Sequence, residues 1–529
     1  MPDRRVRVAL VRDAMKSAKA RGAYYTPANI VSLIVQNTVG RLCDGRTPEQ
    51  ISELKILDPA CGDGAFPAAA CGYLLERGLT HEQALSCVYG VDVDEAALEA
   101  AGRRAGQVVS RASSVVRRQP SVVRGPSCAN LRRGDSLLSF DWHDEFPEAM
   151  ERGGFDAVIG NPPWVSLAGR FGIRAYSKAE IDNLRDRFGG NSYMPNICEY
   201  FVLLGLELTR PGGYLSFIVP DRLGFNSQFA GLRRRLLTQA ELLLLVYGAP
   251  FPGVSADTMI FVIRKVAPRL QSTTEASEYG RPACLYPQAA FLSNRRHEFP
   301  RPEDPDVGRL IERMESLPGR LLLKDICDSA SGFGGRSSLV HENKIGDSEI
   351  PVLKGRSIGR YVMRKRYWFD FRRENLTGRT TDAGKLGASP KILIRKTGDR
   401  LIAAYDDSGT YPEQSLYFLY GNRTDLDFRF ILGILNSRLM NLYYRTRCLT
   451  NKRSFAQVKK ADLDRIPLPP IDLSRPADRA RHDRLVELVD EMLRQQSPST
   501  DHLIDQLVFG LYGIDPGELR RTEAIAERL

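Results

Sequence analysis

Residues 155–164 of this 529-residue chain read FDAVIGNPPW, and this stretch decides how the chain folds. Its first six residues are apolar enough to form a buried strand, and Asn161, Pro162, Pro163 and Trp164 follow directly. The two prolines have a fixed φ and no N–H donor, so they stiffen the loop. Trp164 adds a broad π face. By itself such a stretch fits a structural turn, but it also predicts a ligand-binding loop at the carboxyl edge of an α/β sheet.

A second strand-and-turn motif lies upstream, where residues 56–66 read ILDPACGDGAF. An apolar strand runs into a Gly-rich turn and then into a helix. Glycine lets the backbone come close to a ligand at the end of a strand. An ordinary βα loop would show the same pattern. The candidate ligand-binding residues here are Asp58, Ala60, Cys61, Gly62, Gly64 and Phe66.

Acidic residues end the next two predicted strands. Asp92 closes the strand in VYGVDVD at 88–94, where a carboxylate can accept from ribose hydroxyls, although it could equally cap the following helix. Asp135 in GDSL at 134–137 could accept from an adenine amino group, although by itself this stretch also fits a turn. The order of these motifs, rather than any one of them, favours a nucleotide-like ligand.

The alternation of strands and helices extends over residues 20–265. Predicted strands at 55–57, 87–91, 155–159, 213–219 and 258–264 alternate with helical stretches such as 95–104 and 197–209. This pattern predicts a parallel, doubly wound α/β sheet in a first domain, 1–265. Residues 266–319 are polar and Pro-rich, which predicts a linker. Short strands, turns and one helix at 426–446 predict a mixed α/β domain over 320–475, and 476–529 predict a helical tail with helices at 478–496 and 502–511.

The composition favours a globular protein with a polyanionic partner. The chain is 43% apolar and 26% charged, and 75 Lys and Arg exceed 64 Asp and Glu by 11. Basic runs lie at 103–133, 354–374 and 438–460. Any one of them fits a solvated face, but two lie in the second domain and are mixed with aromatic residues, which favours phosphate contacts. Candidate phosphate-contacting residues are Lys354, Arg356, Lys452 and Arg453.

Other classes of protein have little support in the sequence. Nine Cys occur without a C-x-x-C pair and six His without H-E-x-x-H, so we expect no disulfide framework and no metal site. There is no secretory signal and no apolar stretch of the roughly 18–20 residues that span a membrane. We therefore expect a cytoplasmic protein without membrane contact.

Taken in order, the motifs resemble those of class I S-adenosylmethionine-dependent methyltransferases that act on N6 of adenine in DNA. The order matches the gamma group and the Eco57I-like enzymes of type II restriction–modification systems. GAYYTP at 22–27 is similar to the family's N-terminal cofactor motif, and FPGVS at 251–255 to the segment whose aromatic residue stacks on a flipped adenine. LKGRSI at 353–358, LGILNS at 432–437, IPLPP at 466–470 and the tail at 504–512 resemble the family's recognition domain. Trp164 stands where Tyr or Phe is commoner, and Asp63 where Ser is commoner.

The resemblance implies a Rossmann-like doubly wound methyltransferase sheet, a C-terminal mixed α/β target-recognition domain, and the cofactor S-adenosylmethionine. Tyr25, Thr26, Pro27 and the Gly-rich loop would hold the methionine part, Asp92 the ribose and Asp135 the adenine, with Asn161 beside them. Asn161 and Pro162 would accept the two N6 hydrogens, and Trp164 and Phe251 would stack on the flipped base. Double-stranded DNA is the implied partner. A restriction nuclease or other defence subunits could be encoded separately, and we expect no fused nuclease.

Several alternatives stay open at this stage. The Asn-Pro-Pro-aromatic loop also serves methylation of an RNA base or a protein Gln. N4-cytosine chemistry typically goes with Ser in place of Asn161, and C5-cytosine chemistry needs a nucleophilic Cys that the loop lacks. A DNA-binding defence subunit that has lost turnover is the non-enzymatic alternative.

Overall fold

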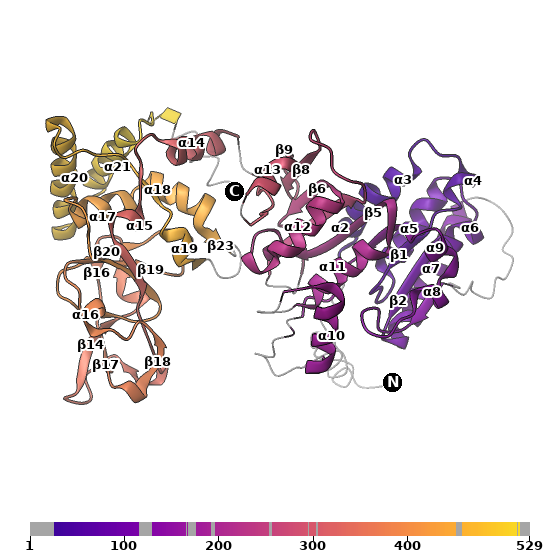
Figure 1. Cartoon of the computed structure of the whole chain (residues 1–529), viewed down its shortest axis with the longest axis horizontal. Coiled ribbons are helices and arrows are strands. Elements are labelled where there is room, and N and C mark those ends of the chain that lie inside the picture. Colours follow the sequence, from indigo (N-terminus) through magenta and orange to yellow (C-terminus); the bar gives the residue numbers. More distant parts are fainter. Residues whose placement is uncertain are drawn as a thin grey trace. The chain divides into compact units, whose positions relative to one another are not determined.

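The computed structural model describes residues 26–115, 130–165, 167, 176–191, 196–252, 256–294, 296–302, 305–450, 457–515 and 517–518. The chain divides into two compact units, Met1–Pro302 (unit 1) and Glu303–Leu529 (unit 2) (Figure 1). Each unit has its own hydrophobic core and is described by itself.

Unit 1 is built on a nine-stranded sheet with the strand order β3-β2-β1-β4-β5-β7-β6-β8-β9. Its strands are β1 Ile56–Asp58, β2 Val88–Asp92, β3 Leu131–Arg133, β4 Phe155–Gly160, β5 Thr209–Pro220, β6 Glu241–Tyr247, β7 Thr258–Arg264, β8 Thr273–Glu278 and β9 Cys284–Pro287. The first five strands in this order run parallel. The predicted doubly wound α/β sheet is therefore confirmed.

The prediction of an all-parallel sheet is wrong at β7, which runs antiparallel to both β5 and β6. The connection between β6 and β7 spans 248–257. A parallel crossover needs a dozen or more residues and usually a helix, so this connection is too short for one. The chain turns back instead and places β7 between β5 and β6.

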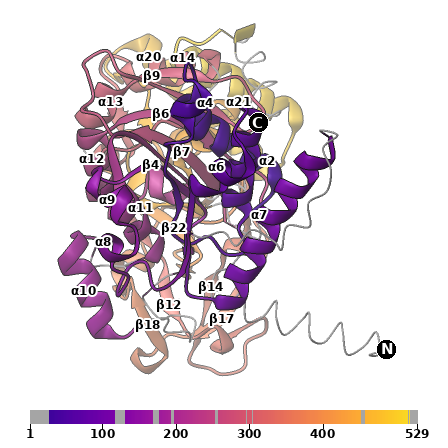
Figure 2. The same cartoon turned by 90° about the vertical axis from the view of Figure 1, so that its right-hand side faces the viewer.

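Helices cover both faces of the sheet, which explains why its strands are apolar on both sides. Along β4, Ala157 and Ile159 belong to the core cluster of one face and Val158 to that of the other. Figure 2 shows α2 and α7 on one side of the strands and α11 and α12 on the other. The helices concerned are α2 Ala28–Val35, α5 Ala65–Glu76, α7 Glu95–Val115, α10 Lys178–Phe188, α11 Ile197–Leu208 and α12 Ala230–Gln239.

The interpretation of 266–319 as a linker is wrong. Strands β8 and β9 extend the sheet beyond β6, and the helix α13 Gln288–Ser293 follows them in unit 1. The helix α14 Pro305–Ser316 already belongs to unit 2. The polar composition arises because β8 has exposed positions beside the buried Thr274 and Ala276, a pattern typical of a strand with one solvated face.

Unit 2 combines small sheets with a helical core. One four-stranded sheet has the order β11-β22-β19-β20 and another the order β13-β17-β14-β21. These strands are β11 Asp328–Ser331, β13 Val340–His341, β14 Glu349–Leu353, β17 Tyr367–Asp370, β19 Lys391–Arg395, β20 Ala403–Asp406, β21 Tyr411–Pro412 and β22 Leu416–Tyr420. The remaining described strands are pairs: β10 Leu321–Leu322 with β25 Pro467–Leu468, β12 Phe333–Gly335 with β18 Leu376–Arg379, β15 Ile358–Gly359 with β16 Val362–Met363, and β23 Leu449–Thr450 with β24 Gln457–Val458.

The helix predicted over 426–446 is broken in two. α17 Phe428–Asn436 ends before Ser437, whose hydroxyl accepts from the N–H of Met440 and caps α18 Arg438–Tyr443. A serine favours a helix start over a helix interior because it satisfies a free N–H there. The apolar periodicity continues through the break, which is why the sequence pattern alone did not show it.

The predicted helical tail forms part of the core of unit 2. α20 Pro476–Arg494 and α21 Pro498–Leu511 bury Leu485, Val489 and Val508 in the same cluster as α17. Arg360, between the short strands β15 and β16, donates two hydrogen bonds to Asp501 on α21. The tail is therefore tied both to the core and to the sheet-rich part of the unit.

The approach of α17 to α20 yields a stability prediction. A β-carbon added at Gly433 would lie 2.9 Å from Val489 and 3.0 Å from Leu485. We expect Gly433→Val to lower the free energy of unfolding by about 2 kcal/mol, the typical cost of overpacking a core. The matched variant Gly510→Val, on α21 with no atom within 4 Å of its added carbon, should be close to neutral. Chemical denaturation compares the two, and equal stabilities would contradict this packing.

Candidate active site

The predicted motifs meet at the carboxyl edge of the parallel strands. β1 lies between β2 and β4, with Asp58 paired to Gly90 and Leu57 to Val158. The Gly-rich turn after β1 is therefore flanked by Asp92 at the end of β2 and by Asn161 just after β4. In open α/β sheets this edge is where ligands bind.

The Gly-rich turn requires its glycines. Gly62 and Gly64 have φ of 52° and 79°, in the left-handed region that favours glycine. A β-carbon on Gly64 would lie 2.6 Å from that of Ala101 on α7. Cys61 and Phe66 are buried beside the turn. Gly64 is buried, and the turn packs tightly against α7.

Asp92 braces this turn. Its Oδ2 accepts from the N–H of Gly62 at 2.9 Å, and its Oδ1 accepts from the N–H of Asp94 at 2.9 Å. A carboxylate offers about four acceptor sites, so each oxygen retains capacity for a further donor. The arrangement fits the predicted pairing with ribose hydroxyls.

Asp58 links the ends of β1 and β4. Its Oδ1 accepts from the N–H of Ala60 at 3.1 Å, and a β-carbon on Gly160 would lie 2.6 Å from the same oxygen. Burial raises the pKa of the Asp58 carboxyl to about 8, and the charges of Asp92 and Asp63 contribute to that rise. At neutral pH the group is therefore largely an uncharged acid.

Asn161 presents a buried acceptor without a partner. Its Nδ2 donates to Thr26 Oγ1 at 3.2 Å, while its Oδ1 has no hydrogen-bond partner among the described residues. An unsatisfied buried acceptor typically costs about 1–3 kcal/mol. Thr26 is itself buried, and the carbonyl of Pro27 accepts from the first N–H groups of α2. Tyr25 lies outside the described residues.

Trp164 and Phe251 lie side by side next to Asn161. Their ring centroids are 5.5 Å apart and their planes are inclined by 49°. A base sandwiched between two rings needs about 7 Å, because each stacking contact takes about 3.5 Å. The structure thus brings the two predicted aromatic residues together but leaves no room for a base between them. Pro162 is buried and Pro163 half-buried.

The loop after β3 is attached to the Gly-rich turn. Asp135 Oδ1 accepts from the N–H groups of Leu137 and Leu138, and Ser136 donates to the carbonyl of Pro59 at 2.6 Å. Burial and the charge of Asp135 raise the pKa of Tyr176, which places Tyr176 near this carboxylate. We assigned no role to Ser136 or Tyr176 from the sequence, because neither stands in a position that a motif marks.

Asp63 has a defined partner. Its carboxylate forms a 2.8 Å ion pair with Arg104 on α7. This contact provides a structural reason for Asp at the position where Ser is commoner in the resembled family. Of the predicted DNA-binding residues, Lys354 and Arg356 follow β14 in unit 2, and Lys452 and Arg453 lie outside the described residues.

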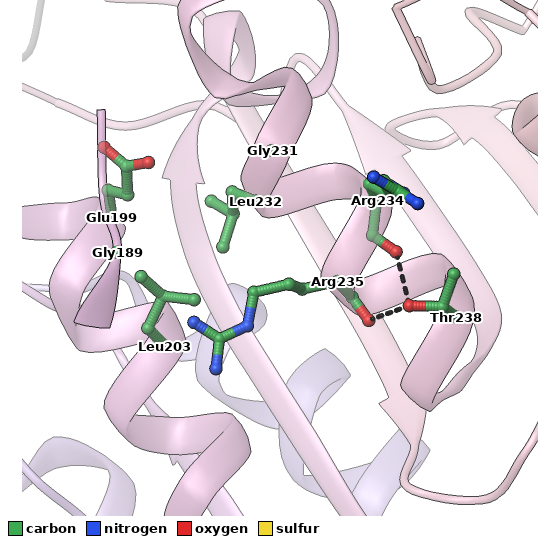
Figure 3. Close-up of a pocket in the computed structure, with 8 residues that line it drawn as sticks. All are labelled: Gly189, Glu199, Leu203, Gly231, Leu232, Arg234, Arg235 and Thr238. Carbon is green, nitrogen blue, oxygen red and sulfur yellow. Dashed lines mark hydrogen bonds between the residues drawn. The ribbon is translucent and has the colours of Figure 1, made fainter. Parts of the chain in front are cut away.

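A pocket of about 430 Å³ lies elsewhere in unit 1, between α11 and α12 (Figure 3). The buried carboxylate of Glu199 accepts two hydrogen bonds from Asn191, and the Arg235 guanidinium reaches the carbonyl of Phe188. None of the predicted site residues lines this pocket. It is lined by Gly189, Glu199, Leu203, Gly231, Leu232, Arg234, Arg235 and Thr238.

Family models match most of the folded regions of the chain. The N-6 DNA Methylase model matches residues 8–103, the Eco57I restriction-modification methylase model 86–249 and the TaqI-like C-terminal specificity domain model 350–468. The chain is therefore similar to the Eco57I-like restriction–modification methyltransferases. The first two models cover the Gly-rich turn and the Asn-Pro-Pro-Trp loop, and the third lies within unit 2.

Curated relatives are restriction–modification proteins. A putative type II restriction enzyme and methyltransferase of Methanocaldococcus jannaschii is 24% identical over 72% of this chain and 33% of its own length. The type II methyltransferase M.VspI of a Vibrio species is 26% identical over 48% of this chain and 50% of its own. RM.Eco57I of Escherichia coli is 23% identical over 43% of this chain and 26% of its own. The chain thus spans half or less of the length of these relatives.

Solved structures confirm the fold. The type IIL restriction–modification enzyme MmeI in complex with DNA matches 94% of this chain and 75% of its own with a TM-score of 0.61 at 12% identity. A nuclease-deletion mutant of the type ISP enzyme LlaGI matches 90% of this chain and 47% of its own, with a TM-score of 0.58 and also at 12% identity. The chain therefore shares its fold with these two solved structures over most of its length.

The described ranges of the chain contain no group of three or more His, Cys, Asp or Glu able to hold a metal ion. None of the helices in these ranges is long and apolar enough to cross a membrane.

The burial of Asp58 generates a pH prediction. The folded carboxyl has a pKa of about 8 against 3.8 when unfolded, so the folded chain holds an extra proton between these values. The contribution of Asp58 to stability is therefore complete below about pH 4 and is lost as pH rises toward about 8. Asp58→Asn should flatten the fall in free energy of unfolding between pH 5.5 and 8, measured by denaturation without cofactor. The same slope in both proteins would show that Asp58 is charged in the fold.

Proposed function

We propose that the chain transfers a methyl group from S-adenosylmethionine to N6 of an adenine flipped out of duplex DNA. The observation that supports this most directly is the unpartnered, buried Oδ1 of Asn161 at the end of β4. An acceptor held in a dry site, beside a Gly-rich turn with acidic neighbours, suits a ligand that brings an N–H group. The similarity to the Eco57I restriction-modification methylase and N-6 DNA Methylase models supports the same chemistry.

The residues at the sheet edge fit S-adenosylmethionine. Gly62 and Gly64 form a tight turn, Asp92 retains acceptor capacity for a diol, and Asp135 lies just after the neighbouring strand β3. When bound, the cofactor supplies a methyl group on a positively charged sulfur. The residues that would hold it are Thr26, Pro27, Asp58, Ala60, Cys61, Gly62, Gly64, Phe66, Asp92, Asp135 and Asn161, with Tyr25 as a further candidate outside the described residues.

The chain's own groups would activate the target amine. The N6 lone pair of adenine is delocalised into the ring, which makes the amine a poor nucleophile. Asn161 Oδ1 and the carbonyl of Pro162 would each accept a hydrogen bond from one N6–H and so favour the tetrahedral amine. Acceptors fixed before reaction stabilise that geometry more than the planar ground state, which is the requirement for catalysis. Pro162, which has no N–H, cannot turn a donor toward the amine.

The target base would have to leave the duplex to reach Asn161. Trp164 and Phe251 would then stack on it, a contact worth about 1–3 kcal/mol per base. Since the two rings lie 5.5 Å apart, the base enters by displacing one of them, or it stacks on the outer face of Trp164. In the first case, adenine binding is coupled to a rearrangement of this aromatic pair.

DNA is the substrate class that the second unit favours. The TaqI-like specificity model matches unit 2, and the structural neighbours MmeI and LlaGI are described in complex with DNA or a DNA mimic. Lys354, Arg356, Lys452 and Arg453 are our candidate contacts. A separately encoded nuclease or other defence subunits would complete a restriction–modification system, since fused restriction enzymes occur among the relatives.

The role of Asn161 is tested by Asn161→Ala. Loss of the acceptor should lower methyl transfer by about 100- to 1000-fold, the usual effect of removing one preorganised transition-state contact. Binding of S-adenosylmethionine, measured by calorimetry, should persist because the Gly-rich turn and Asp92 are intact. Transfer from tritiated cofactor at the wild-type rate would refute the assignment.

The acceptor class is tested with the same tritiated cofactor and duplex DNA, RNA or protein offered separately. We expect label in duplex DNA. Label in RNA or protein would favour the corresponding alternative substrates. DNA binding without label in any acceptor would indicate a non-catalytic defence subunit.

A further inference from the structure

Three cationic side chains of unit 2 converge on one aromatic ring. Lys354 Nζ lies 5.1 Å, the Arg356 guanidinium carbon 4.8 Å and Lys365 Nζ 5.5 Å from the centroid of the Tyr367 ring. All three distances lie within the range of cation–π attraction. Tyr367 itself is 3% exposed and packs in the core of the sheet-rich part of unit 2. The ring therefore provides a fixed platform for the three charges.

The backbone explains why these residues meet. Lys354 and Arg356 follow β14, whereas Lys365 precedes β17, and these two strands pair antiparallel with Val352 opposite Tyr367. The N–H of Arg364 donates to the carbonyl of Ser357 at 2.7 Å and closes the intervening segment. Two parts of the basic run at 354–374 are thereby brought to one place, and both are held by hydrogen bonds.

Two of the three cations lack a close ion pair. Lys365 pairs with Glu342 at 2.8 Å, but neither Lys354 nor Arg356 has a carboxylate at ion-pair distance in the part of the chain that the structure describes. Burial lowers the pKa of Lys354, and the neighbouring charge of Arg356 lowers it further, against the opposing charges of Glu413 and Glu342. Glu413 is engaged by the N–H and hydroxyl of Ser415. Cations held together in this way favour an anion between them.

We propose that Lys354, Arg356 and Lys365 form a phosphate-binding site, built on Tyr367, that contacts the backbone of duplex DNA. This inference rests on the proposed function. It specifies that the cluster of cations on Tyr367 contacts DNA phosphates. Arg364 and Arg366 are exposed next to Lys365 and extend the positive surface. Because the three charged groups lie over one ring, they form a compact positive centre, which positions a backbone rather than reads base edges.

The test is the salt dependence of duplex binding by the full chain, measured by fluorescence anisotropy with two unrelated DNA sequences. The double variant Lys354→Gln with Arg356→Gln should weaken the salt dependence of binding. The negative slope of the log association constant against log salt concentration should become shallower by about 1–2, since each phosphate contact contributes about 0.9. The loss of affinity should be similar for both sequences. The matched control, Arg320→Gln with Arg400→Gln, removes the same charge from exposed positions of unit 2 and should leave the slope unchanged.

Circular dichroism confirms that each variant is folded, and Lys365→Gln, at an exposed position, provides an independent variant with an expected slope change of about 1. An unchanged slope in both site variants overturns the inference and leaves the proposed function intact. A loss confined to one DNA sequence, or an equal loss in the control, also overturns it. Loss of binding to a polyglutamate chain with unchanged DNA binding would assign the surface to an acidic protein. A wild-type chain that binds no duplex would refute the proposed function itself.

Discussion

The contact between Asp58 and Gly160 joins the two halves of the site. Gly160 has no side chain because the Asp58 carboxyl fills the space where a β-carbon would lie, 2.6 Å from Oδ1. The end of β1, which leads into the Gly-rich turn, is therefore fixed against the end of β4, which delivers Asn161. Any ligand that binds along the turn is then presented to Asn161 at a set position. In enzymes such positioning accounts for much of the rate enhancement.

The acids at this edge are arranged so that their charges do not accumulate. Asp58 is buried with a raised pKa and stays largely protonated, Asp92 is stabilised by two backbone donors, and Asp63 is paired with Arg104. Three carboxyl groups can thus surround one turn without destabilising it. The same arrangement gives the edge a mildly negative character that suits a ligand with a positive centre. In unit 2, by contrast, three cations gather on Tyr367.

The sequence predicts which residues lie at the sheet edge better than it predicts strand direction, helix breaks and tertiary contacts. Strands such as β4 are buried on both faces, so they appear as continuous apolar runs, and the residues that follow them must lie at the edge. The antiparallel β7 and the strands β8 and β9 were missed because direction and pairing depend on connection length and on long-range contacts. The break at Ser437 lies within an unbroken apolar pattern. The distance between Trp164 and Phe251 and the cation cluster on Tyr367 arise from tertiary packing, which no local pattern encodes.

We propose that the buried amide oxygen after β4 directs methylation to N6 of adenine in DNA. Mass spectrometry of nucleosides, after the purified chain has acted on duplex DNA with S-adenosylmethionine, tests this role. We expect N6-methyldeoxyadenosine in the digest, dependent on both cofactor and chain. N4-methyldeoxycytidine in its place, or unmodified DNA under conditions where the chain binds both ligands, would contradict it.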